Sequence, residues 1–95
     1  MPNPVVIREK TVFDEVFVGG TLTGIQTTVT MRVDGEAVVV STAWSLPENE
    51  HLSAEEWMAQ KRTIGPSLVL RAAQDTNLEY EIMTAVQAHI AAAAS

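Results

Sequence analysis

Cysteine is absent from the 95 residues of this chain, and basic residues are few. Without cysteine there can be no disulfide, no thiolate nucleophile and no cysteine-ligated zinc or iron–sulfur site. No apolar run approaches the ~18 residues of a membrane span, and no basic segment precedes an apolar signal core. Lys and Arg number 6 against 12 Asp and Glu, and a net charge of −6 is the wrong sign for a general nucleic-acid binder. We therefore expect a cytoplasmic protein that contacts neither membranes nor, directly, nucleic acid.

The apolar sequence that is present suffices for one small core. Hydrophobic residues make up 46% of the chain and charged residues 19%, which is typical of globular rather than disordered proteins. A chain of this length has no room for a second core, so residues 1–95 are predicted to form a single domain.

The first part of the chain, about residues 5–46, has the pattern of three β-strands, because Val, Thr, Ile and Phe alternate there between glycine-containing turns. Asp34-Gly35 suits a two-residue type I′ turn, in which both central residues need a positive φ. Counting back from this turn opposes Val33 with Glu36, Met31 with Val38, Val29 with Val40, Thr27 with Thr42, and Ile25 with Trp44. These residues share one largely apolar face, which we expect to be the core face.

The turn between the first two strands contains Gly19-Gly20. A two-residue loop would put Lys10 and Asp14 on the core face, whereas a three-residue loop that includes Thr21 shifts the register by one residue. We expect the longer loop, because it directs the aromatic side chains into the core. It opposes Phe17 with Thr23, Phe13 with Thr27, and Ile7 with Val33.

Residues 47–52 read as a connector to a helical second half. Ser53 followed by Glu56 is a capping box, and it predicts a helix over about 54–64. That helix is expected to end at Gly65, a residue common just after helix C-termini.

A second helix is predicted over about 67–93, since Pro66 suits the first position of a helix. Thr76 opens another capping-box pattern and leaves a break in this helix as an alternative, although one continuous helix is favoured. The predicted fold class is α+β, a three-stranded antiparallel meander (βββ) covered on one face by two C-terminal helices.

The sheet face opposite the helices carries more apolar side chains than a solvated face needs. Val16 and Val18 on the first strand and Val39 on the third belong to it. β-propensity alone accounts for such residues equally well, but a spare apolar face and two unpaired sheet edges also suit an interface. We therefore expect a homodimer or a subunit of a complex.

Acidic residues gather around the start of the first helix. Glu48, Glu50, Glu55 and Glu56 fall within nine residues that contain no basic residue. The helix dipole favours acidic residues there, and the functional alternative is a patch that docks on a basic partner. Trp57, next in sequence, is expected either in the core or as an exposed interface anchor.

Catalytic and metal-binding patterns are weak. His51 and His89 have no ligand spacing around them, so no metal or cofactor is expected. If Met1 is removed, the Pro2 amine could act as a general base in a small dimeric enzyme, which we retain as an alternative.

Another alternative concerns nucleic acid. Lys61, Arg62 and Arg71 flank Gly65-Pro66 and could supply the phosphate contacts of a helix–turn–helix, or the acidic patch could mimic nucleic acid. The net charge of −6 argues against direct contact.

The combined features predict a non-enzymatic, small acidic module that binds another protein, as a regulator, inhibitor or accessory subunit. A phage or other mobile element would be a fitting source. The expected partner-binding residues are Val16, Val18, Val39, Trp57, Glu48, Glu50, Glu55 and Glu56.

Overall fold

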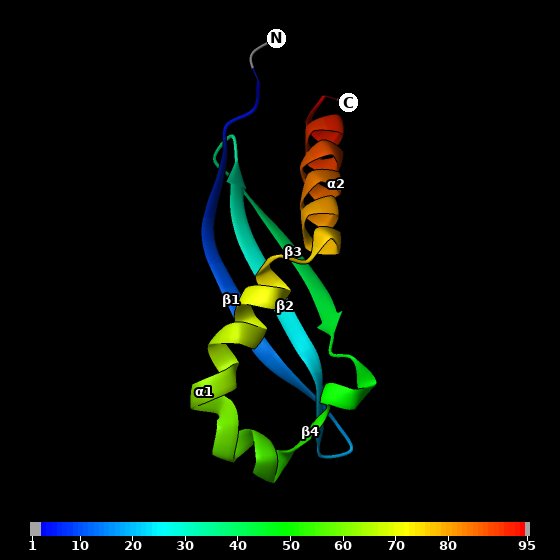
Figure 1. Cartoon of the computed structure of the whole chain (residues 1–95). Helices are drawn as coiled ribbons and strands as arrows, with labels where there is room; N and C mark the ends of the chain where they lie inside the picture. The colour runs from blue at the N-terminus through cyan, green and yellow to red at the C-terminus, as the bar shows by residue number, and fades with distance from the viewer. Residues whose placement is uncertain (1–2, 95) are drawn as a thin grey trace.

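The computed structural model describes residues 3–94 and confirms the α+β class, with an antiparallel meander followed by two helices. In chain order the elements are β1 (Val6–Val18), β2 (Thr21–Val33), β3 (Glu36–Ser45), the 3₁₀ turn η1 (Glu48–Glu50), β4 (Leu52–Ser53), α1 (Ala54–Ala73) and α2 (Thr76–Ala93). The sheet order is β1-β2-β3, and the short β4 pairs with the start of β2. The helices follow each other along one face of a long twisted sheet, so the molecule measures 52 × 20 × 18 Å (Figure 1).

The hairpin of β2 and β3 has the predicted register. Asp34 and Gly35 both have positive φ, at 49° and 85°, as the expected turn requires. All five predicted pairs from Val33–Glu36 to Ile25–Trp44 are present. Alternate residues of β2 are buried, namely Ile25, Thr27, Val29, Met31 and Val33. The core face was therefore predictable from the turn and the period of two.

The turn between β1 and β2 differs from the prediction. Gly19 and Gly20 alone form the loop, both with positive φ, and Phe17 lies opposite Leu22. The expected three-residue loop and the pairing of Phe17 with Thr23 are therefore wrong. Thr23 is instead an extra residue on β2, a β-bulge that a sequence pattern does not reveal.

This bulge has two consequences for the register. Beyond it the strands are offset by one residue, so Phe13 does face Thr27 as predicted. It also leaves Leu22 fully buried on the helix side.

A second bulge lies at Glu9 on β1, where the register shifts back between Arg8 and Lys10. Val6 consequently pairs with Val33, and Ile7 pairs with Arg32 on the open face. The prediction that Ile7 faces Val33 is wrong for this reason.

The predicted helix boundaries also need correction. Helix α1 runs from 54 to 73, through Gly65-Pro66, and does not end near 64. Because Pro66 has no N–H, the helix loses one internal hydrogen bond there, and α1 curves along its length (Figure 1). Gly65 lies beside the ring of Trp57 in the same helix, and that ring would be 3.4 Å from an added Cβ.

The break between the helices falls at Asp75, so the expected continuous helix over 67–93 is wrong. Asp75 caps α2, and its carboxylate accepts a hydrogen bond from the Asn77 backbone N–H at 3.2 Å. The residues that α2 buries are Leu78 and Ile82.

The core consists of two clusters, one under each helix. The cluster between α2 and the sheet consists of Val29, Met31 and Val40 from the sheet and Leu78 and Ile82 from α2. The cluster at α1 consists of Trp57 and Leu68 from the helix, together with Leu22 and Leu46. Both clusters are built on β2, because the helices cross β2 and β3 rather than β1.

Candidate interaction surface

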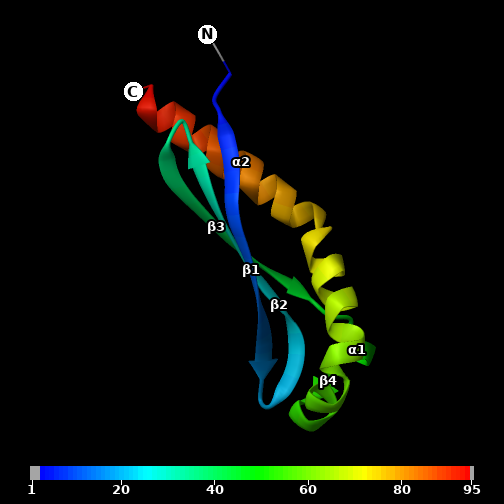
Figure 2. The same ribbon diagram turned by 90° about the vertical axis from the view of Figure 1, so that its left-hand side faces the viewer.

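β1 is the strand that the helices leave uncovered. Helix α1 packs on β2, and α2 packs on β3 and β2, whereas β1 makes extensive contact only with β2 among the described elements. None of the 13 residues of β1 is buried. Figure 2 shows β1 at the front of the molecule, with the helices to one side and behind. Its outer edge and much of its helix-side face are therefore open.

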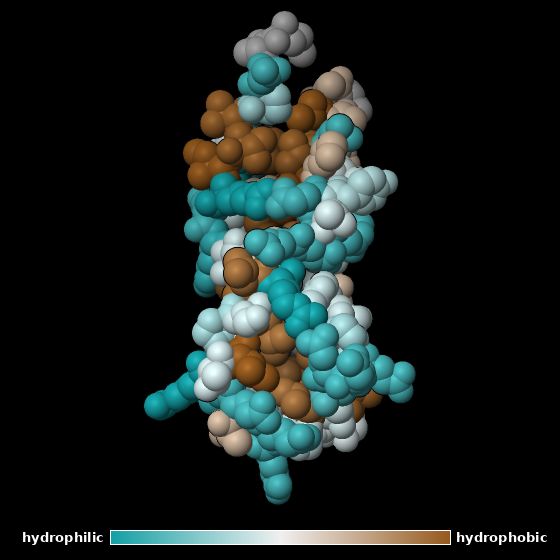
Figure 3. All heavy atoms as spheres, in the orientation of Figure 1, coloured by the Kyte–Doolittle hydropathy of each residue, from teal (hydrophilic) through white to brown (hydrophobic). Residues whose placement is uncertain are grey.

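Large apolar side chains are exposed at both ends of β1. Val5, Val6 and Ile7 lie at the beginning and Phe17 and Val18 at the end, each 41–63% exposed. Figure 3 shows hydrophobic surface gathered where the beginning of β1 and the end of α2 come together. Contiguous exposed apolar surface of this kind is typical of binding sites.

The middle of β1 is charged and is tied to its surroundings at two points. Arg8 forms an ion pair with Glu79 of α2 at 2.7 Å, which bridges the gap between β1 and the helix. Glu9, in the bulge, accepts a hydrogen bond from the Arg32 side chain at 3.0 Å. Both pairs are about half exposed, so they orient side chains more than they stabilise the fold.

A half-open hydrophobic groove lies between β1 and α1, which we call the β1–α1 groove. Its volume is about 230 Å³. It is lined by Phe13, Glu15, Ile25, Trp57, Lys61, Arg62, Gly65, Pro66 and Val69. The apolar lining reaches the buried side chains of Ile25 and Trp57, and the charged residues supply polar groups beside it. A groove with this lining is suited to bind an apolar side chain that has a polar group beside it.

The open sheet face is less continuous than the sequence suggested. Val16 lies opposite Gly24, and Val39 lies opposite Thr30, in the row of Lys10. Polar side chains occupy the middle, where Gln26 donates a hydrogen bond to Ser41 at 2.6 Å. Val18 and Val39 are both exposed, but they are not brought together with Val16 into one apolar patch.

Trp57 belongs to the core. Its side chain is only 7% exposed and packs with Leu22, Leu46 and Leu68, so it is not the exposed anchor that one interpretation expected. Its neighbour Met58 is exposed instead.

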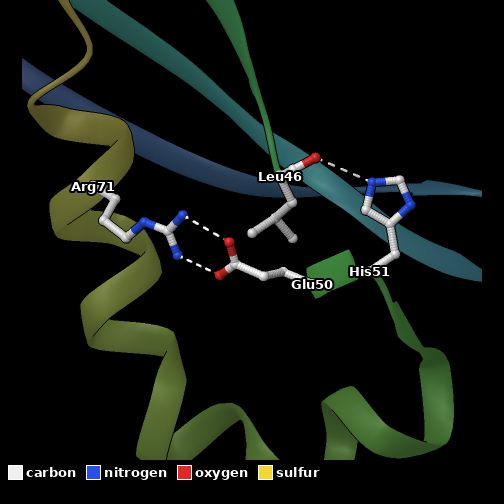
Figure 4. Close-up of polar contacts among 4 residues, drawn as sticks. All are labelled: Leu46, Glu50, His51 and Arg71. Carbon is white, nitrogen blue, oxygen red and sulfur yellow. Dashed lines mark hydrogen bonds and ion pairs between the residues drawn. The ribbon is translucent and has the colours of Figure 1, made fainter. Parts of the chain in front are cut away.

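The acidic cluster is partly neutralised within the chain (Figure 4). Arg71 donates two hydrogen bonds to the Glu50 carboxylate, at 2.7 and 3.1 Å, and these lower the pKa of Glu50 and raise the pKa of Arg71. The Arg71 guanidinium also lies 5.0 Å from the ring centre of Trp44. Arg71 is thus engaged in the protein and is a poor candidate for a phosphate contact.

Glu56 is engaged as well, which confirms the predicted capping box. Its carboxylate accepts the Ser53 N–H at 2.9 Å, and the Ser53 hydroxyl accepts the Glu56 N–H at 3.1 Å. The hydrogen bonds from Ser53 lower the pKa of Glu56. Within residues 3–94, Glu48 and Glu55 are the members of the acidic cluster whose carboxylates have no such partner.

The remaining candidates receive little support as chemical sites. A ring nitrogen of His51 forms a hydrogen bond with the Leu46 carbonyl oxygen at 3.1 Å (Figure 4), and a ring nitrogen of His89 lies 3.7 Å from the Glu36 carboxylate. In the described part of the chain, no three metal-ligating side chains come together. Pro2 lies outside the described residues. The helix–turn–helix is wrong, because α1 continues through Gly65-Pro66 without a turn.

Sequence reasoning missed the β1–α1 groove. Phe13 and Val69 both have the spacing of core residues, and nothing local indicates that α1 crosses β2 at a distance from β1. The charged residues on β1 were the available signal, since a strand with Arg8, Lys10 and Asp14 is rarely buried on both faces.

Comparisons with protein-family models, curated proteins and solved structures find no significant match to this chain. Among residues 3–94, neither helix is long and apolar enough to cross a membrane.

Proposed function

We propose that the chain is a non-enzymatic protein–protein interaction module, a regulator, inhibitor or accessory subunit, and that its β1–α1 groove receives an apolar side chain of its partner. The observation that carries this proposal is the groove itself, which extends from the surface to the buried Ile25 and Trp57. Binding energy at interfaces concentrates where an anchor side chain fills such a hollow.

The charges around the groove indicate the kind of partner segment. Lys61 and Arg62 lie on the α1 side and Glu15 on the β1 side. A peptide segment with a large apolar residue beside an acidic one would place its carboxylate near Lys61 and Arg62. Such charges contribute more to specificity and association rate than to affinity.

The groove is tested by comparing two variants that each add one negative charge to α1. Val69→Asp places a carboxylate in the groove, whereas Gln60→Glu places one on an exposed part of α1 that does not line it. Tagged protein is incubated with lysate of the source cells, cross-linked and analysed by mass spectrometry. We expect one protein captured by the wild type and by Gln60→Glu, and lost with Val69→Asp.

Circular dichroism establishes that both variants are folded before capture is compared. Equal capture by the two variants would contradict the groove as the binding site. Nuclease treatment distinguishes the nucleic-acid alternative, since capture through nucleic acid would be lost with nuclease, whereas capture of a protein through the groove would not.

A further inference from the structure

We propose that two copies of the chain pair through the free edge of β1, antiparallel about a two-fold axis at Val12, and so join their sheets into one. This interface uses the strand edge and not the groove, so it goes beyond the function proposed above.

The edge is unusually long for a strand left in water. β1 has 13 residues with β2 on one side, and within residues 3–94 no other strand pairs with it. Figure 2 shows no helix in front of this edge. An uncovered edge presents a row of backbone N–H and C=O groups that can pair with another strand. The opposite edge belongs to β3, which is shorter at 10 residues and whose Thr42 side chain accepts a hydrogen bond from Asn77 of α2 at 3.1 Å.

The sequence of β1 is complementary to itself around Val12. When two copies run antiparallel with Val12 opposite Val12, Thr11 of each lies opposite Phe13 of the other, and Lys10 lies opposite Asp14. The two-fold axis repeats each pair, so two lysine–aspartate pairs flank the centre. Opposite charges directly across a strand pair stabilise it.

The bulge at Glu9 makes the outer part of β1 complementary too. In an unbulged pairing Glu9 would face Glu15 of the second copy, and two like charges would meet. Glu9 is already left out of the pairing with β2, where Arg32 holds it at 3.0 Å. If Glu9 is also left out of the pairing with the second copy, the register shifts by one residue, and Arg8 then lies opposite Glu15 of that copy.

Beyond Arg8 the same register matches the exposed apolar residues at the two ends of β1. It opposes Ile7 with Val16, Val6 with Phe17, and Val5 with Val18. All of these except Val16 are among the exposed large hydrophobic side chains of the chain, and pairing would remove them from water.

Each proposed pair also joins residues of the same sheet face, as strand pairing requires. The residues of β1 on the helix side are those paired with β2 residues whose side chains are buried, namely Val6, Arg8, Thr11, Phe13, Glu15 and Phe17. Ile7, Lys10, Val12, Asp14 and Val16 are on the open side. A register without the bulge would break this agreement from Arg8 outward.

The two-fold axis is tested by introducing a single cysteine. Because the chain contains no other cysteine, any disulfide that forms must join the introduced residues. In the proposed dimer the two copies of residue 12 face each other at the spacing that a disulfide needs, so Val12→Cys should cross-link almost completely under mild oxidation. Ser41→Cys is the matched control, because Ser41 lies in the same row and on the same face but on β3. We expect it to remain unlinked.

The register is tested by exchanging charges. Lys10→Asp opposes two aspartates at each pair, and Asp14→Lys opposes two lysines, so each variant should dimerise about tenfold more weakly or worse than the wild type. Mixed together, the two variants should form a heterodimer, since every pair then joins opposite charges. Sedimentation and native mass spectrometry measure both effects.

A wild-type chain that stays monomeric up to its highest soluble concentration would overturn the proposal. Cross-linking of Ser41→Cys instead of Val12→Cys would do so too, as would a mixture of the charge variants that forms no heterodimer. The groove is judged separately, because Val69→Asp should abolish partner capture and leave the dimer intact.

Discussion

β1 and β2 are neighbouring strands of 13 residues each, yet β2 supplies most of the buried strand residues and β1 none. The content of apolar residues does not explain the difference, since β1 carries Val12, Phe13, Val16 and Phe17 beside its charged residues. The position of the helices explains it, because α1 and α2 cross β2 and β3 and leave β1 at the side. Apolar content therefore does not decide which strand is the core and which remains available for binding.

The largest expected effect comes from truncating a cross-strand pair that joins the two strands, Leu22 on β2 and Phe17 on β1. Leu22 is fully buried among Leu46, Trp57 and Leu68, so Leu22→Ala should lower the free energy of unfolding by about 2–5 kcal/mol. Phe17 is 43% exposed, and Phe17→Ala should lower it by only about 1 kcal/mol.

Urea denaturation of both variants, at a protein concentration low enough to favour the monomer, measures these two losses. Equal losses would mean that β1 is packed as firmly as β2, and the contrast between the strands would then be wrong.

Gly24 provides a second test of the contrast between β2 and β1, because at Gly24 β2 has a neighbouring strand on each side. It lies opposite Val16 of β1 and Ser45 of β3, and an added Cβ would overlap the backbone carbonyl oxygen of Trp44. Gly24→Ala should therefore lower the free energy of unfolding by about 1–3 kcal/mol.

Gly65→Ala is the control for Gly24→Ala, measured by the same denaturation. An added Cβ there meets the Trp57 ring at ordinary contact distance, and alanine favours helix over glycine. We expect its stability to be unchanged or raised. If Gly24→Ala were equally tolerated, β3 would be able to move away from β2, which would weaken the description of β2 as the fixed centre of the sheet.

The same contrast explains what could be predicted from the sequence. The β2–β3 hairpin followed from Asp34-Gly35, because a tight turn fixes the register and a buried face confirms it. β1 was predicted only in its middle, at Phe13–Thr27, because bulges at Thr23 and Glu9 shift both of its ends. A bulge depends on tertiary fit and leaves no repeating pattern.

The helix boundaries were predicted wrongly for a related reason. Gly65-Pro66 has the form of a helix end, but α1 continues through it, and Gly65 lies beside the Trp57 ring of the same helix. The break occurs at Asp75, whose capping of the Asn77 N–H competes successfully with a continuous helix. The groove between β1 and α1 depends on this arrangement, so it was not predictable from local signals.

The smallest expected effect concerns Glu50 and Arg71, which tie α1 to the turn η1 on the β3 side of the molecule. Hydrogen bonds from Arg71 lower the pKa of Glu50 below its ordinary value of 4.5. A carboxylate whose pKa is lower in the folded state binds its proton more readily when unfolded. Its contribution to stability is therefore present above pH 4.5 and is lost as the pH falls through the lower folded-state pKa.

Glu50→Gln should accordingly reduce stability slightly at neutral pH and make it fall less steeply below pH 4.5 than in the wild type. Arg71→Lys keeps the charge but cannot donate the paired hydrogen bonds, so it should give an intermediate acid response. Thermal unfolding followed between neutral and acidic pH measures both.

Glu79→Gln is the comparison variant on the β1 side, where Arg8 donates a single hydrogen bond to Glu79. We expect Glu79→Gln to change stability less than Glu50→Gln at neutral pH. A larger loss with Glu79→Gln would mean that α2 holds β1 more firmly than α1 holds the connector, and β1 would then be a fixed part of the core and not a strand free to pair.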